Sequence, residues 1–261
     1  MHIHAQPFWV QKFGNSREEY EDAHWPRRLI DRKASHCRFA VADGATETSF
    51  SGLWARLLIW AYQRDDLSAG EVSQALSSYQ KMWSDHVGKK PLPWFAEEKV
   101  RQGAFSSILG LSLSEAAESA ARGNWQSTAV GDSCLCQVRN DALVVSFPLE
   151  SAAEFNSRPT LLSSNPQVRV EDSQVRERKG EWESGDSFFL MTDALACWFL
   201  EATVKDEKPW DILRGFNGQD EPLSDDPGHG PNRAFSEWVQ QLRQGGAMKN
   251  DDVTLVRITV E

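Results

Sequence analysis

Short apolar runs that stop abruptly at glycine or polar residues dominate the hydrophobic pattern of this chain. Continuous or alternating apolar runs of this length, bounded by turn residues, are typical of β-strands. The residues 139–142 between two such runs have turn chemistry, which predicts a β-hairpin. The predicted strands are 8–13, 38–42, 106–112, 127–130, 134–138, 143–147, 188–192 and 253–260.

Other segments place their apolar residues three or four positions apart, which predicts amphipathic helices. The predicted helices are 50–64, 72–83, 94–102 and 234–244. The alanine-rich, polar stretch 114–124 favours a loop or a helical turn. The stretches 148–174 and 215–231 show no period, so we expect irregular loops there. The terminal residues His2 and His4 are expected to be disordered.

Composition and charge narrow the class of protein. The 261 residues are 40% hydrophobic, and no repeat or long linker divides them, so we expect one domain over 1–261. The net charge of −10 without a basic block argues against nucleic acid or an anionic membrane surface as partner. No apolar run approaches the ~18 residues of a membrane span, and the N-terminal residues do not resemble a signal peptide. We therefore expect a cytoplasmic protein.

The 4 cysteines form no Cys-x-x-Cys pair, so we expect reduced thiols rather than a zinc or redox site.

Aspartates stand at the ends of four strongly apolar predicted strands. They are Asp43, Asp132, Asp193 and Asp251. We expect one edge of the fold to gather them, and oxygen ligands without His or Cys select Mg²⁺ or Mn²⁺. Two such ions can activate a water for displacement at phosphorus, so the pattern points to phosphate ester hydrolysis. Arg17 is the candidate to grip the phosphate, because a guanidinium donates two parallel hydrogen bonds.

Each of these residues also has a simpler interpretation. Asp43 and Asp193 could be helix N-caps. Asp132 and Asp251 could be ordinary turn residues. Arg17 could belong to a surface ion pair worth under ~1 kcal/mol.

Five segments, in order, are similar to motifs of the metal-dependent (type 2C, PPM) protein serine/threonine phosphatases. They are 17–24, with an arginine four residues before Glu-Asp-Ala; 39–44, ending in Asp-Gly; 130–133, Val-Gly-Asp-Ser; 190–195; and 251–255. The resemblance spans almost the whole chain from Arg17 onward. It implies an α+β fold, a four-layer α-β-β-α sandwich with two central antiparallel sheets flanked by helices.

The resemblance also implies an activity and roles for individual residues. The activity is hydrolysis of phosphoserine and phosphothreonine in proteins by a water bridging two Mn²⁺ or Mg²⁺ ions. Asp43 would bridge the ions, the Gly44 carbonyl would bind the second, and Asp193 and Asp251 would complete the first. Further implied ligands are Glu21 and Asp22, through waters, and Asp132, at a looser third ion. Arg17 would hold the substrate phosphate.

The chain departs from the family pattern at several positions. Residues 45–47 lack the family's usual histidine or further glycines, Ala194 replaces a glycine, and Cys197 stands where an acid is frequent. The resemblance implies a phosphoprotein substrate and a cognate kinase, and we expect a monomer. Two alternatives stay open: a catalytically weak or silent phosphatase-fold signalling module that binds phosphoproteins, and a Mg²⁺-dependent hydrolase of small phosphate esters.

Overall fold

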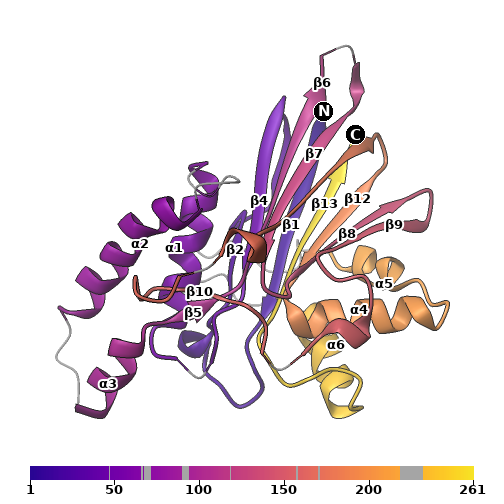
Figure 1. Ribbon diagram of the computed structural model, residues 1–261. Coiled ribbons are helices and arrows are strands. Elements are labelled where there is room, and N and C mark those ends of the chain that lie inside the picture. The colour runs from indigo at the N-terminus through magenta and orange to yellow at the C-terminus, as the bar shows by residue number, and fades with distance from the viewer. Residues whose placement is uncertain are drawn as a thin grey trace.

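The computed structural model describes residues 1–46, 48–65, 67, 72–89, 94–117, 119–156, 158–169, 171–217 and 232–261. Two large antiparallel β-sheets form its centre (Figure 1). The first sheet comprises, in spatial order, β3 (Ile30–Lys33), β1 (His2–Val10), β13 (Val253–Val260), β12 (Ser187–Met191), β8 (Cys134–Arg139) and β9 (Ala142–Phe147). The second comprises β11 (Arg176–Glu183), β7 (Ser119–Val130), β6 (Ile108–Ala116), β4 (His36–Ala42) and β2 (Ala23–Trp25). A small ribbon pairs β10 (Leu162–Ser163) with β5 (Phe105–Ser106).

Helices cover the outer faces of both sheets. One group comprises α1 (Ser51–Gln63), α2 (Val72–Val87) and α3 (Trp94–Gln102). The other comprises α4 (Asp193–Val204), α5 (Pro209–Gly215) and α6 (Arg233–Gln244). Three short 3₁₀ turns are Arg17–Glu19, Ala152–Glu154 and Asp172–Gln174. The two groups of long helices lie on opposite sides of the paired sheets (Figure 1).

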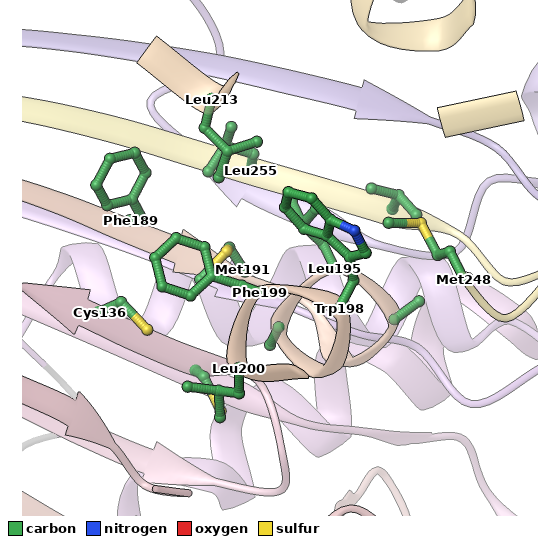
Figure 2. Packing of buried hydrophobic residues seen from close by; sticks show 14 of the residues in the cluster. Cys136, Phe189, Met191, Leu195, Trp198, Phe199, Leu200, Leu213, Met248 and Leu255 are labelled. Carbon is green, nitrogen blue, oxygen red and sulfur yellow. The ribbon is translucent and has the colours of Figure 1, made fainter. Parts of the chain in front are cut away.

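Three hydrophobic clusters hold these layers together. The central cluster lies between the sheets and joins residues such as Phe39 and Leu111 of one to Phe188 and Val256 of the other. A second cluster packs α1 and α2 against the sheet that contains β4. The third packs α4, α5 and α6 against the sheet that contains β12 (Figure 2). The four-layer α-β-β-α sandwich predicted from the sequence is therefore confirmed.

One prediction about local structure is wrong, and one edge strand was missed. The stretch 114–124 is neither loop nor helix but belongs to β6 and β7, which form a hairpin that extends past the rest of the sheet (Figure 1). Both of its faces are partly solvent-exposed there, so no buried side imposes alternation. The charged strand β11 was not predicted either, because an edge strand needs backbone pairing with β7 more than apolar side chains.

The N-terminal residues are also ordered, contrary to expectation. His2 and His4 belong to β1, which runs His2–Val10 rather than over 8–13 and pairs with both β13 and β3. Ile3 and Ala5 on the same strand are fully buried, so the pairing is locked by the central core.

The hairpin of β8 and β9 is confirmed. Most of the loop predicted at 215–231 lies outside the described residues, so that prediction stays untested.

No helix in the described ranges is long and apolar enough to cross a membrane.

Candidate active site

Strand register brings the first set of predicted residues to one edge of the β4 sheet. β2 and β4 are antiparallel with Ala23 opposite Ala42, so Asp22, just before β2, lies beside Asp43, just after β4. β6 starts opposite the end of β7, with Ile108 facing Val130, which brings the Gly131–Asp132 turn to the same edge.

The other sheet delivers the remaining aspartates to the same end. β12 and β13 are antiparallel with Met191 opposite Leu255, so Asp193, after β12, is next to the start of β13, where Asp251 and Asp252 stand. β8 begins beside the end of β12, with Cys134 facing Met191, so that Asp132 is shared between the sheets. Antiparallel pairing thus gathers residues that are far apart in sequence.

Hydrogen bonds tie the two sheets together at this edge. The Thr254 hydroxyl donates to Asp22 Oδ2 (2.7 Å), and the Tyr20 hydroxyl forms a short hydrogen bond with the same Thr254 oxygen. The Asp252 carboxylate accepts from the backbone N–H groups of Glu21 and Lys12, both at 2.7 Å. The segment that precedes β2 is therefore fixed against the start of β13.

Two glycines let helix α1 and the Asp43 loop approach the Glu21 segment closely. A Cβ at Gly44 would lie 2.6 Å from the Glu21 carbonyl oxygen, and a Cβ at Gly52 would lie 3.1 Å from Glu21 Cα. The Ser51 hydroxyl, between these glycines, donates a short hydrogen bond to Glu21 Oε1. The backbone of Gly44 thus has a packing requirement that any side chain would violate.

Ser107 joins the Asp43 and Asp132 loops. Its hydroxyl accepts from the backbone N–H of Asp43 (3.1 Å) and hydrogen-bonds the Ser133 hydroxyl (2.8 Å). Its own N–H donates to the Asp43 carbonyl oxygen (2.8 Å). Gly131 has φ +104°, and a Cβ there would lie 2.6 Å from Ser107 Cβ, so Ser107 packs closely against the Asp132 loop.

The gathered carboxylates raise one another's pKa values. Burial, followed by the charges of Asp22, Asp193, Asp132 and Asp251, raises the pKa of Asp43 well above its usual range. Burial and then Asp252 do the same to the pKa of Asp22. Burial, reinforced by Asp193, raises the pKa of Asp132 to about 7. The cluster concentrates negative charge where water cannot fully solvate it.

Counter-charges reach only part of the cluster. Lys249 Nζ lies 2.6 Å from Asp251 Oδ2 and 3.5 Å from Asp193 Oδ2. Among the described residues, no side chain forms a hydrogen bond or ion pair with the Asp43 carboxylate. Asp22 Oδ1 is buried and has no hydrogen-bond partner in that part of the chain. Asp22 and Asp43 are therefore the uncompensated members.

The donor set fits a hard divalent cation in kind. All candidate ligands are carboxylate or carbonyl oxygens, which Mg²⁺ and Mn²⁺ prefer, and the unpartnered Asp22 oxygen is a free donor. Their present arrangement differs from the predicted metal site, because within the described ranges no group of three or more His, Cys, Asp or Glu is placed to hold an ion. Hydrogen bonds to Glu21 and Asp22 and the ammonium of Lys249 occupy several of the oxygens instead.

Arg17 has no ion pair with the carboxylates within the described ranges. Its side chain is exposed on the 3₁₀ turn, and within the described chain it forms no hydrogen bond or ion pair.

The N-cap alternative fails for Asp43, because α1 begins only at Ser51. Asp193 is the first residue of α4, after the N-cap Thr192, and its Oδ1 accepts from the N–H of Ala194 (2.6 Å).

Several residues around the site were not predicted from the sequence. They are Tyr20, Ser107, Lys249, Asp252 and Thr254. Asp252 and Lys249 offered a signal, since both are charged and within two residues of Asp251. Tyr20 and Thr254 lie inside segments that resemble family motifs, 17–24 and 251–255, although no role was predicted for them. Ser107 offered no signal, because its importance comes from strands that pair with distant segments.

Comparisons with known proteins agree with this architecture. The serine/threonine phosphatase PstP/Ppp of Mycobacterium tuberculosis is similar over 100% of both chains, with 16% identity and a TM-score of 0.58. The chain has the fold of the PPM phosphatases. Two further structures share this PPM fold: PppA of Pseudomonas aeruginosa (15% identity, 100% of this chain and 99% of that chain, TM-score 0.55), and RsbX in complex with magnesium (14%, 100% and 96%, 0.51).

The similarity to PPM structures is one of fold. A PstP catalytic domain with this PPM fold was solved with 2 manganese ions, at 14% identity, 99% of both chains and a TM-score of 0.55. No protein-family model matches the sequence, and no curated protein matches it.

Proposed function

We propose that this chain is a single-domain PPM phosphatase that hydrolyses phosphoserine and phosphothreonine in proteins in the presence of Mn²⁺ or Mg²⁺. The observation that carries the proposal is the gathering of carboxylates from both sheets at one edge, with Asp22 and Asp43 lacking any counter-charge among the described residues. Buried acids in this state are costly to the fold unless cations neutralise them. The shared fold with phosphatases supports the same reading.

The proposed roles follow the chemistry of each side chain. Bound in pairs, divalent ions lower the pKa of water and offset the charge of a phosphoryl group. Candidate ligands are Asp43, the Gly44 carbonyl, Asp193 and Asp251, with Glu21 and Asp22 holding waters and Asp132 at a possible third ion. Arg17 is free to swing toward a phosphate, because its exposed guanidinium has no partner within the described chain.

The chain's own hydrogen bonds would orient these groups. Thr254 fixes Asp22 Oδ2, which leaves Oδ1 available, and the Ser51 hydroxyl fixes Glu21. Ser107 holds the backbone of Asp43 at both its N–H and its carbonyl oxygen. A site assembled in this way needs little rearrangement of the backbone when it is loaded.

We also propose a phosphoprotein partner and a cognate kinase that opposes the reaction. PppA, which shares the fold, is a key regulatory component of T6SS in Pseudomonas aeruginosa, and this supports a regulatory phosphoprotein as substrate. A monomeric state and a cytoplasmic location remain predictions from the sequence.

The decisive test is metal-dependent phosphate release from a phosphothreonine peptide and from p-nitrophenyl phosphate. We expect Mn²⁺-dependent turnover by the unchanged protein, and a loss of about 10³-fold in Asp43→Asn, because several kcal/mol of charge stabilisation disappear. The matched control is Asp85→Asn, an exposed acid on α2, which should keep full activity. Equal activity in chelator and in Mn²⁺ would reject the proposal, and turnover of small esters without turnover of phosphopeptides would favour a small-molecule hydrolase.

One observation favours a second candidate, a weak or silent signalling module with the same fold. Lys249 already neutralises Asp193 and Asp251, and Ala194 and Cys197 depart from the family pattern beside them. Binding of a phosphopeptide without turnover at saturating Mn²⁺ would select this candidate.

A further inference from the structure

We propose that Lys249 is an internal counter-ion that competes with a metal ion for Asp193 and Asp251, and so sets the metal affinity of the site. The inference rests on the proposed metal-dependent function, and it adds a residue that determines how readily the site is loaded. An ammonium group and a divalent cation cannot both occupy the space between the same two carboxylates.

The position of the Lys249 ammonium carries the inference. Nζ lies 2.6 Å from Asp251 Oδ2 and 3.5 Å from Asp193 Oδ2, so one cation is shared by an acid before β13 and an acid at the start of α4. The side chain of Lys249 is 66% exposed, whereas those of Asp193 and Asp251 are 17% and 19% exposed. The ammonium therefore reaches from the solvent side into a largely enclosed pair of carboxylates.

The backbone around Lys249 is anchored on both sides. Met248 is buried in the cluster that also contains Trp198 and Leu255 (Figure 2). Asn250 forms two hydrogen bonds with the backbone of Phe13, at 2.8 and 3.2 Å. Arg243 donates a short hydrogen bond to the Asp251 carbonyl oxygen. The Lys249 backbone is thus held at the site, while its four-carbon side chain can swing into solvent without disturbing the fold.

The charge of Lys249 is felt unevenly across the cluster. It acts on Asp132, Asp193 and Asp251, whereas the strongest influences on Asp43 after burial are other acids. Competition should therefore weaken an ion bound at Asp193 and Asp251, and leave the Asp22 and Asp43 side of the cluster open. An exposed lysine paired with a single acid would not act in this way, because such pairs are worth little.

Calorimetric titration of the full chain with Mn²⁺ tests the competition directly. We expect Lys249→Met to bind Mn²⁺ about tenfold or more tightly, because no ammonium then competes with the metal for the two carboxylates or repels it. Lys249→Arg, which keeps the charge, should bind as the unchanged protein does. The matched control is Lys208→Met, which removes an ammonium that pairs with Asp141 away from the site, and it should leave the Mn²⁺ affinity unchanged.

Thermal unfolding supplies a readout that needs no turnover. In chelator, Lys249→Met should melt at a lower temperature than the unchanged protein, because two neighbouring acids lose their counter-charge. With Mn²⁺ the variant should show the larger upward shift in Tm. Unchanged or weaker Mn²⁺ affinity in Lys249→Met overturns the inference, including the case in which only the KM for substrate rises.

The outcomes also separate this inference from the proposed function. Tighter Mn²⁺ binding by Lys249→Met without phosphatase activity supports the competition and rejects the phosphatase. Mn²⁺-dependent turnover with equal affinity in both proteins supports the phosphatase and overturns the competition. Absence of Mn²⁺ binding in both proteins overturns the two together.

Discussion

Two buried aspartates, Asp186 and Asp22, contrast the two ends of the sandwich. Asp186 precedes β12, whose other end leads to Asp193, and its side chain is 1% exposed; Asp22 is 2% exposed. Asp186 accepts hydrogen bonds from Arg139 Nε (2.9 Å) and Nη2 (2.7 Å), from Gln137 Nε2 (2.7 Å) and from the N–H of Glu183 (3.0 Å). Asp22 has Thr254 on one oxygen and no partner in the described chain on the other.

This difference distinguishes an acid that is fully paired within the fold from one that is not. Arg139 pairs with Asp186 through two parallel hydrogen bonds. The negative charge of Asp186 is therefore balanced within the fold, and both of its carboxylate oxygens are hydrogen-bonded. For Asp22, which is equally buried, the burial itself and then the charge of Asp252 raise the pKa, because no counter-charge stabilises the carboxylate. Burial alone therefore says little about the role of an aspartate, whereas the identity of its partners says much.

The largest expected effect is on stability when the satisfied acid is removed. Asp186→Ala should lower the free energy of unfolding by about 3 to 5 kcal/mol, because Arg139 and Gln137 lose their buried partner. Asp22→Asn, at nearly the same burial, should leave the metal-free protein as stable or more stable. Urea unfolding in chelator gives the free energy of unfolding of both variants. Equal destabilisation by the two substitutions would contradict the difference between Asp186 and Asp22.

The next effect is expected from pH, and it has a defined sign. Asp132 has a folded pKa of about 7, whereas an aspartate in the unfolded chain titrates near ~4. The folded protein therefore binds the extra proton, and the stability that this contributes is complete below pH ~4 and is lost as pH rises through ~7. At about 1.4 kcal/mol for each of these roughly three pKa units, we expect the metal-free protein to lose up to about 4 kcal/mol across this range relative to Asp132→Asn.

The comparison with Asp132→Asn isolates one acid from the other titrating groups. Unfolding of both proteins in urea at several pH values, in chelator, gives the difference directly. A difference that grows with pH in favour of the unchanged protein would show instead that the fold stabilises Asp132 as a carboxylate.

The smallest expected effect concerns the contact between the Asp43 and Asp132 loops. Ser107→Ala removes the acceptor for the Asp43 N–H and the partner of the Ser133 hydroxyl, so stability should fall by about 1 to 2 kcal/mol. The Mn²⁺ affinity should fall as well, because the backbone of Asp43 loses a support. Ser78→Ala, on the exposed face of α2, is the matched control, and an equal effect there would show that Ser107 has no special place.

The sequence predicted that the acids lie at one edge better than it predicted their hydrogen-bond partners and counter-charges. Asp43, Asp193 and Asp251 follow or precede strongly apolar strands, and antiparallel order sends such ends to one edge. The partners of these acids depend on side chains that reach across loops, as Lys249 does, and no periodic pattern encodes that reach. The roles of the acids as metal ligands remain predictions.

The strands themselves show the same limit. Buried strands such as β12 can be recognised in the sequence by their apolar residues, because both of their faces are covered. β11 and the extended ends of β6 and β7 are built from charged, small and polar residues whose backbone groups pair with a neighbour. Pairing of this kind is a property of the partner strand, and it leaves no trace in the segment's own composition.

The hydrogen bond between Thr254 and Asp22 joins residues that are 232 positions apart. A ribosome that has made only the first half of the protein has therefore made no complete site, however well that half has folded. Whatever reaction the acids support can begin only after β13 has emerged and paired between β1 and β12. Fragments that lack this strand should therefore lack the complete set of acids.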